Sequence, residues 1–130
     1  MQRKSFIQAA AMGTLGILAP KFSTKMSTKN IFIHHVYFWL KNPESRDDYH
    51  KLLEGLEGLS KVRTIHMCHI GKPADTNRDV IDRSYSVSWM LIFKNKDDQE
   101  KYQVDPIHLQ FVKDYSALWS KVIVYDSVDV

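Results

Sequence analysis

One ten-residue run, Ile31–Leu40, constrains the fold of this chain more than any other part of its sequence. It reads IFIHHVYFWL and contains no Gly, Pro, Asp, Glu, Lys or Arg. Successive side chains of a strand point to opposite faces, so His34 belongs to one face and His35 to the other. Both faces are otherwise apolar or aromatic, which predicts a strand that is covered on both sides.

The remaining sequence predicts helices and strands that alternate after this first strand. Helices are expected over 43–58, 96–103 and 106–120, and further strands over 62–70, 84–93 and 121–128. Asn42 and Pro43 are expected to start the first helix, and Asp105 and Pro106 the last. The order β-α-β-β-α-β predicts an α+β fold of the ferredoxin-like type, with one antiparallel four-stranded sheet and helices on one face.

Such a sheet leaves its second face without a covering layer. Because both faces of the first strand are apolar, a monomer would expose an apolar patch of a size that soluble monomers rarely tolerate. The sequence therefore predicts a second sheet packed on the first, most simply in a two-fold homodimer. The second face would carry one of two apolar sets: Phe32, His34, Val36, Phe38 and Leu40, or Ile31, Ile33, His35, Tyr37 and Trp39. If it carries the second set, His35 lies in the interface, where packing is its simplest role and a pH-sensitive dimer is the alternative.

Charge and composition narrow the class of protein further. The 130 residues include 18 basic and 15 acidic side chains, a net charge of +3. Residues 1–26 carry four of the basic side chains and no acid, so residues 27–130 have 14 basic and 15 acidic side chains. A near-neutral domain without a basic stripe argues against nucleic-acid binding. The single Cys excludes an internal disulfide, and the length indicates one domain, over 27–130.

The first 26 residues have the pattern of an export leader. A short basic start precedes the mildly apolar run 6–19, and the run Arg3–Gln8 (RKSFIQ) resembles a twin-arginine signal with Lys at the second position. This predicts export to the periplasm. The alternatives are a disordered tail, or a cytoplasmic protein whose translation starts at Met26. The run is too short and too weakly apolar for a stable membrane span.

Three segments of the domain carry a family resemblance. His34–Lys41 (HHVYFWLK) resembles the opening strand of the stress-responsive α/β-barrel (Dabb) family, and Tyr102–Phe111 resembles that family's Y-x3-HP-x-H-x2-F stretch. Trp119 and the closing run Val122–Asp126 are similar to its last helix and strand. The resemblance covers residues 31–128 and implies a dimeric α/β barrel, in which two ferredoxin-like sheets close face to face.

The resemblance also implies a pocket between each sheet and its own helices. A plant polyketide cyclase of the family closes a ring in this pocket by an aldol condensation, and its catalytic side chains correspond to His34, Tyr102 and His108. The residues expected to bind the ligand are Val36, Phe38, Leu56, Trp89, Phe111, Trp119, Val122 and Val124. The chain departs from the pattern at Leu56, where the cyclase has Tyr, and at Asp105, where many members have His.

Two functions of different classes follow from these residues. The first is a non-catalytic homodimer that binds a small hydrophobic ligand, with an apolar carbonyl compound as the candidate, or whose fold serves a stress or envelope role. The alternative is a cyclase or isomerase that needs no cofactor, in which His34 and His108 move protons and Tyr102 donates a hydrogen bond to a developing oxyanion. A third reading, a cofactor-free monooxygenase, has no test in the sequence. Convergence of the two imidazoles on one cavity would distinguish an enzyme from a filled core.

The other reactive side chains have simpler interpretations. His66 and His69 lie at an odd spacing on a predicted strand, so they point to opposite faces and no metal site is expected. Cys68 between them is expected to be a buried, inert thiol. Asp126 is expected to satisfy backbone or tyrosine groups rather than to act as an acid.

Overall fold

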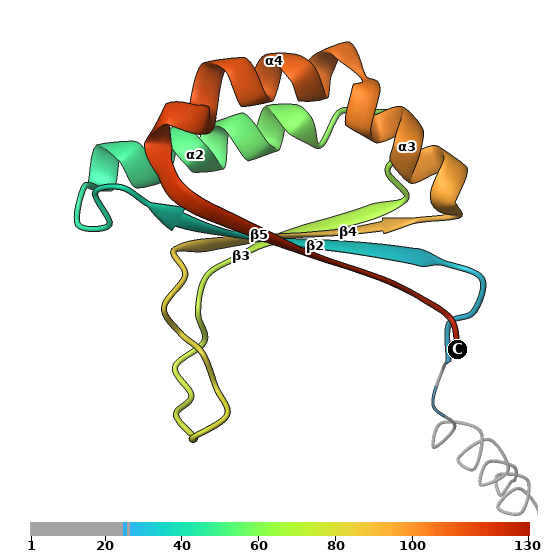
Figure 1. The fold of residues 1–130 in the computed structure, drawn as a ribbon, viewed down its shortest axis with the longest axis horizontal. Helices are drawn as coiled ribbons and strands as arrows, with labels where there is room; N and C mark the ends of the chain where they lie inside the picture. The colour runs from blue at the N-terminus through green and yellow to red at the C-terminus, as the bar shows by residue number, and fades with distance from the viewer. Residues whose placement is uncertain (1–24, 26) are drawn as a thin grey trace, which may run out of the picture.

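The computed structural model describes residue 25 and residues 27–130, so the predicted leader lies outside the described residues apart from Lys25. The order is β2 (Phe32–Leu40), α2 (Arg46–Leu59), β3 (Met67–Gly71), β4 (Val87–Phe93), α3 (Lys96–Val104), α4 (Pro106–Tyr115), the 3₁₀ turn η2 (Ser116–Leu118) and β5 (Trp119–Val128). The strands form one sheet in the order β3-β4-β2-β5, with antiparallel pairing throughout. The three helices cover one face of this sheet, which confirms the predicted ferredoxin-like α+β fold (Figure 1).

The helices begin at residues whose side chains cap them. The Ser45 hydroxyl accepts a hydrogen bond from the Asp48 amide, and Asn95 and Asp105 accept from the amides of Asp98 and Ile107. The predicted starts of α3 and α4 are therefore correct. The predicted start of α2 at Asn42 and Pro43 is wrong, because the chain first makes a turn in which the Ser45 amide donates to the Asn42 carbonyl.

The starts of three strands also differ from the prediction, and that of β4 is at Val87 instead of residue 84. The segment Val62–Ile65 continues the end of α2 as turns, with the Val62 amide bonded to Leu59 and the Ile65 amide to Val62. Strand β3 consequently begins only at Met67. Strand β5 begins earlier than predicted, at Trp119, because the last helix ends at Tyr115 and only the short η2 turn follows.

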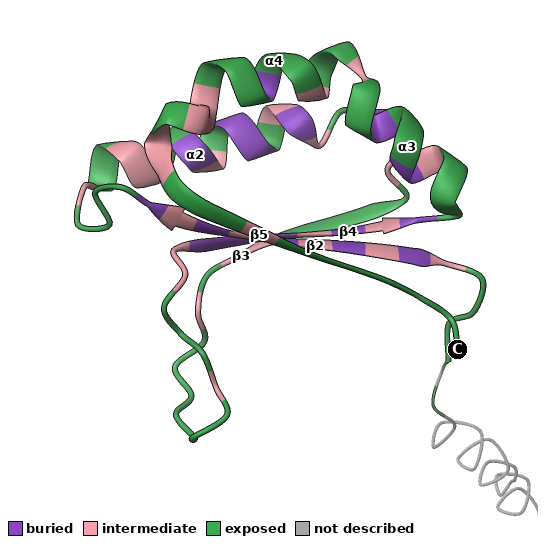
Figure 2. Cartoon of the chain, viewed as in Figure 1, coloured by how far each residue is buried: buried purple, intermediate pink, exposed green. Residues whose placement is uncertain are grey.

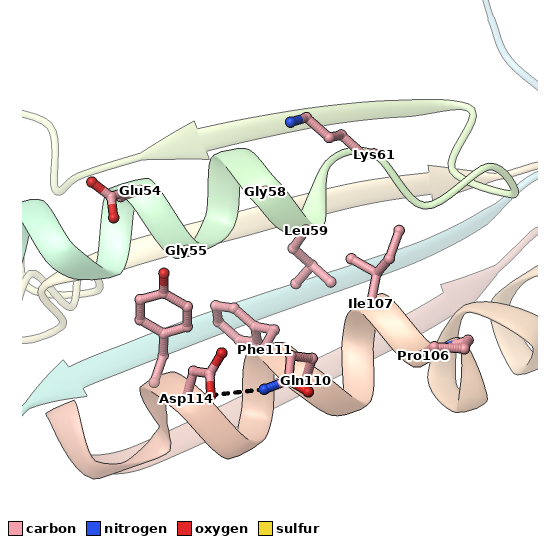
Figure 3. Close-up of a pocket in the computed structure, with 11 residues that line it drawn as sticks. Glu54, Gly55, Gly58, Leu59, Lys61, Pro106, Ile107, Gln110, Phe111 and Asp114 are labelled. Atoms are coloured by element: carbon pink, nitrogen blue, oxygen red, sulfur yellow. Dashed lines mark hydrogen bonds between the residues drawn. The ribbon is translucent and has the colours of Figure 1, made fainter.

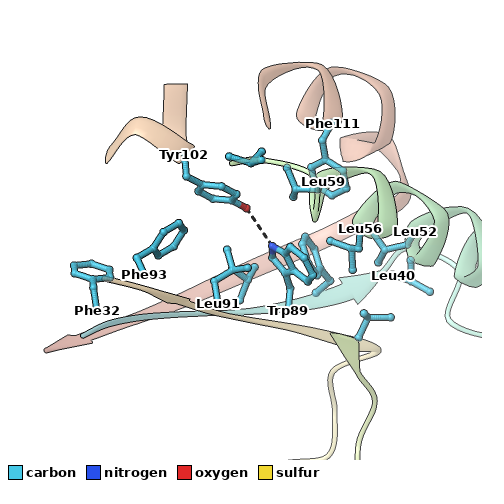
Figure 4. Packing of buried hydrophobic residues seen from close by; sticks show 14 residues of the cluster. Phe32, Leu40, Leu52, Leu56, Leu59, Trp89, Leu91, Phe93, Tyr102 and Phe111 are labelled. Carbon is cyan, nitrogen blue, oxygen red and sulfur yellow. Dashed lines mark hydrogen bonds between the residues drawn. The ribbon is translucent and has the colours of Figure 1, made fainter. Parts of the chain in front are cut away.

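The core lies between the sheet and the helices, as the purple segments of Figure 2 show. In β2 every second residue is buried, beginning with Phe32, and the alternate residues are half-buried. Strand β4 sends Trp89 and Leu91 to the same core, where they meet Leu52 and Leu56 of α2 (Figure 4). The two faces predicted for the first strand are therefore confirmed. Tyr85, which precedes β4, packs against Tyr37 on the opposite face.

Strand β3 is an edge strand, and the helices do not cover it. Cys68 is therefore exposed, and the prediction of a buried thiol is wrong. Partial desolvation, with the Glu57 carboxylate as a second cause, nevertheless raises the pKa of the Cys68 thiol. The thiol is thus exposed without being activated, since the thiolate is the reactive form. Among the described helices, none is long and apolar enough to cross a membrane.

A groove of about 440 Å³ separates α2 from α4 on the outer surface (Figure 3). Its floor includes Gly55, where an added Cβ would lie 2.9 Å from the ring of Tyr115 and 3.0 Å from that of Phe111. At Gly58, one turn further along the same helix, an added Cβ would meet nothing within 4 Å. Gly55 is therefore required for the close approach of the two helices, whereas Gly58 is not.

We expect Gly55→Ala and Gly58→Ala to change stability in opposite directions. Overpacking at Gly55 is expected to lower the free energy of unfolding by about 1–3 kcal/mol. The same change at Gly58 is expected to raise it by about 0.5–1 kcal/mol, because Ala loses less conformational entropy in a helix than Gly. Urea denaturation of the two full-length variants measures both changes in the free energy of unfolding. Equal stability of the two variants would contradict the packing of α4 on α2.

Candidate ligand pocket

A second cavity, of about 610 Å³, lies between the sheet and helices α3 and α4. It contains all three predicted catalytic residues and, of the predicted ligand-binding residues, Val36, Phe38, Trp89, Phe111, Trp119, Val122 and Val124. Residues that the sequence reasoning did not select complete its lining: Leu59, Gln99, Gln103, Val112, Ser116 and Asp126. The structure thus brings the predicted side chains around one cavity, and their role in binding stays a prediction.

Leu56 is the one predicted pocket residue that does not line this cavity. It is fully buried in the core beneath α2, and Leu59, one turn further along the helix, contributes to the cavity instead. The resemblance placed Leu56 at the position of a tyrosine, and a match without gaps does not give the rotation of a helix over the sheet. The spacing of His108, Phe111 and Val112 on α4 is the signal that would have found Val112.

The strongest polar contact of the cavity joins His34 to Asp126. Their residues are directly opposite in the β2–β5 register, and Nδ1 of His34 lies 2.6 Å from Oδ1 of Asp126. A carboxylate can only accept, so Nδ1 carries the proton and Nε2 of the neutral ring keeps a free lone pair. The expectation that Asp126 serves backbone or tyrosine groups is wrong. It orients the imidazole, as the third group does in nucleophile–base–carboxylate arrangements.

The Tyr102 ring lies between the two predicted histidines. Its centroid is 5.8 Å from that of His34 and 4.7 Å from that of His108. The phenol oxygen accepts a hydrogen bond from Nε1 of Trp89 at 3.1 Å (Figure 4). Burial raises the pKa of Tyr102 well above its ordinary value, and the Trp89 bond offsets only part of this rise. The hydroxyl therefore stays protonated and has its own proton left to donate.

His108 begins the apolar face of α4 and is half-buried. Its Nδ1 lies 3.1 Å from the Gln103 carbonyl oxygen, which can only accept, so the neutral ring again has its free lone pair on Nε2. Burial is the largest cause that lowers the pKa of His108, and His34 lowers it further. The Gln103 hydrogen bond and Asp105 oppose this shift. Because the ordinary value is already near 6.5, the ring is neutral at pH 7.

These groups make a cavity with one polar end and one apolar wall. The polar end offers one protonated phenol as a donor, together with the Nε2 atoms of two imidazoles. The wall is aromatic and aliphatic, with Trp89, Phe111 and Trp119 as its largest members. Among the described residues, no group of three or more His, Cys, Asp or Glu side chains could hold a metal ion.

The fold and the cavity define a class: ferredoxin-like α+β proteins that enclose a cavity between their sheet and their own helices. The chain belongs to the stress-responsive A/B barrel domain family, whose model matches residues 32–129. A stress-response A/B barrel domain-containing protein of Arabidopsis thaliana is 25% identical over 96 residues, which are 73% of this chain and 83% of the relative.

Solved structures agree with this assignment at the level of the fold. A Dabb family protein from Mesorhizobium loti has a TM-score of 0.65 at 22% identity, with 77% of this chain and 97% of that chain covered. The hydroxynitrile lyase of Passiflora edulis has a TM-score of 0.64 at 18% identity, with 79% of this chain and 96% of the lyase covered. A dimeric protein of unknown function from Bacteroides fragilis has a TM-score of 0.62 at 15% identity, with 79% and 100% covered.

Proposed function

We propose that this protein is a homodimer that binds a small, largely apolar carbonyl compound in the cavity between its sheet and its helices. The observation that carries the proposal is the cavity itself. Its volume of about 610 Å³ is within the range of small-molecule sites, and its polar groups converge from β2, β5, α3 and α4. A core histidine satisfied by the backbone would not need such a space beside it.

The chemistry of the polar end supports a carbonyl group in the ligand. The Tyr102 hydroxyl accepts from Trp89 and keeps its own proton to donate, and a carbonyl oxygen accepts such a bond. Nε2 of His34 has no partner among the described residues, and neither does Nε2 of His108. These two atoms would accept from a hydroxyl or an acidic C–H of the same ligand.

The uncovered face of the sheet supports the dimer. Ile33, His35, Tyr37 and Trp39 of β2 lie on this face and are half-buried even in the single chain. Met67 and Tyr125 add exposed apolar surface from the two edge strands. Several similar structures are described as dimeric, among them those from Bacteroides fragilis, Thermobifida fusca and Jannaschia. A second copy would cover this face and leave both cavities, which lie on the helix side, accessible.

The hydrogen bond between His34 and Asp126 supports a second candidate, an isomerase or cyclase that needs no cofactor. A neutral imidazole oriented by a carboxylate is suited to remove a proton from a carbon beside a carbonyl. A protonated phenol near the same point could stabilise the enolate oxygen. Identities under 25% to the solved structures show the fold alone, so the similar proteins do not supply this activity.

Native mass spectrometry of the full chain, purified gently from its source cell, tests the binding function. We expect a dimer with a defined extra mass. Val124→Trp would fill the cavity from an edge strand where Val124 is 43% exposed, so the fold should tolerate it. It should abolish the extra mass and weaken binding of the apolar dye anilinonaphthalene sulfonate by about tenfold or more, as expected when a pocket is blocked.

Val128→Trp is the matched control, because Val128 lies on the same strand and the same face but does not line the cavity. This variant should keep the extra mass and should bind the dye as the unmodified chain does. A dimer without extra mass and without Val124-sensitive dye binding would refute the pocket. If a molecule is found, turnover of that compound that His108→Ala abolishes would favour the enzyme over the binding protein.

A further inference from the structure

His35 lies at the centre of the uncovered face of the sheet. In the register of the four strands it is opposite Met90 on one side and Tyr125 on the other. His69 is opposite Met90 from the far side, so one row across the sheet contains His69, Met90, His35 and Tyr125. A partner that covers this face would therefore cover the His35 imidazole.

The contacts of His35 hold its ring in place on the uncovered face. Its ring stacks on Tyr37, with 4.4 Å between centroids and 26° between planes, and Nδ1 lies 3.2 Å from the Tyr37 hydroxyl oxygen. A neutral ring can accept the hydroxyl proton at Nδ1, whereas a protonated ring can only donate there. The Tyr37 hydroxyl oxygen can accept from the protonated ring, so this contact persists on protonation and the cost of protonation comes from the surroundings of the ring.

The groups that face His35 supply no counter-charge. Strand β4 presents Met90, with Ser88 and Ile92 beside it, and none of these titrates. From β5 the titratable neighbour is Tyr125, from β3 it is His69, and Tyr85 of the β3–β4 connection reaches Tyr37. Lys121 and Asp82 line a hollow of this face that Tyr37 and Tyr125 also line, and the Lys121 amine lies 4.5 Å from the centre of the Trp39 ring. The neighbours of His35 are neutral or potentially cationic.

These surroundings already act on His35 in the single chain. Burial is the largest cause that lowers the pKa of His35, and His69 and His34 lower it further. A second copy on this face would remove more water from the ring and would bring a second His35 and a second His69 into the same interface. Each step makes the protonated ring less favourable than it is in the free protomer.

We propose that the dimer is controlled by pH, because protonation of His35 on the covered face of the sheet releases the second copy. The inference rests on the proposed function, since it requires the homodimer. The direction of the pH effect follows from the linkage between proton binding and dimerisation. The dimer binds fewer protons than two free protomers, so acidification favours dissociation. With one His35 per protomer, the dissociation constant rises by up to about 100-fold per pH unit below the pKa of His35 in the free protomer.

Sedimentation analysis of the full chain between about pH 8 and pH 5 tests the proposal, with circular dichroism to show that the protomer stays folded. We expect the dissociation constant of the unmodified dimer to rise about tenfold or more over this range. His35→Phe keeps the stack on Tyr37 without a titrating group, and His35→Gln keeps a neutral polar tip. In both variants the rise should be under about threefold, because the proton-linked group is gone.

His50→Gln is the control, because His50 is an exposed histidine on α2, on the other side of the sheet. It should dissociate with acid like the unmodified chain. A dimer at about pH 8 that persists unchanged to pH 5, or His35 variants that dissociate as the unmodified chain does, would overturn the pH control and leave the proposed function intact. A monomer at about pH 8 would refute the dimer and, with it, the inference.

Discussion

Tyr37→Asp is expected to convert the dimer into folded monomers. Tyr37 is near the middle of the uncovered face, with ring centroids 4.9 Å from Tyr85 and 6.0 Å from Tyr125. Burial, with Tyr85 and Tyr125 as further causes, raises the pKa of the Tyr37 hydroxyl, which shows that this position already disfavours a negative charge. A carboxylate here would be desolvated by the second copy, and Lys121, which lines the same hollow, lies over the Trp39 ring, so we expect a cost of about 3–5 kcal/mol per charge.

Such a penalty corresponds to a rise in the dissociation constant of at least about 100-fold, even if only one charge is fully desolvated. Sedimentation at about pH 8 measures it, away from the titration of histidine. Leu109→Asp is the control, because Leu109 is an apolar side chain of α4 that is already 56% exposed on the helix side. It should leave the dimer intact. A Tyr37→Asp protein that remains dimeric would show that the copies meet elsewhere.

Trp89→Ala is expected to cause the largest loss of stability, about 3–5 kcal/mol, since it removes a large aromatic side chain from the core. Trp89 is 1% exposed and lines the cavity between the sheet and helices α3 and α4. Its loss would also remove the hydrogen bond to Tyr102. Urea denaturation of the full chain measures the change, and Val104→Ala, at an exposed position of α3, should stay within about 0.5 kcal/mol of the unmodified protein.

A double-mutant cycle separates the hydrogen bond from the packing. Tyr102→Phe leaves the buried indole N–H without an acceptor and should cost about 1–3 kcal/mol. Trp89→Phe removes the donor but keeps an aromatic ring, and the double variant should cost less than the sum of the two. Strict additivity would mean that the bond does not contribute, and that the Tyr102 hydroxyl is not held in place for a ligand.

The alternation of β2 shows how far local pattern predicts this fold. Each residue of Phe32–Leu40 is on its expected face, because the direction of a side chain in a strand depends only on the parity of its position. Asn95 and Asp105 cap α3 and α4 as predicted, because a cap is a contact within three residues. The start of α2 was less predictable, because Asn42 and Ser45 are both good caps and only the approach of the chain from β2 selects Ser45.

The candidate site likewise contains residues that could be predicted from the sequence and residues that could not. His34, Tyr102 and His108 could be named from their order and spacing in a family pattern, and the structure places them around one cavity. Asp126 was assigned another role, because its contact with His34 joins residues 92 positions apart and depends on the register of β2 with β5. Leu59 rather than Leu56 lines the cavity, because the rotation of α2 over the sheet is set by packing against α4.

Local sequence patterns are sufficient for the order of the elements and for the two faces of the first strand, because periodicity and short-range capping act within a few residues. The choice of His34 and His108 came from the family resemblance instead. Only the tertiary structure decided the partner of His34, the exposure of Cys68 and the floor of the cavity. Each of these depends on which strand lies at an edge and which residues meet across the sheet, and pairing between distant segments leaves no mark in the local pattern of either one.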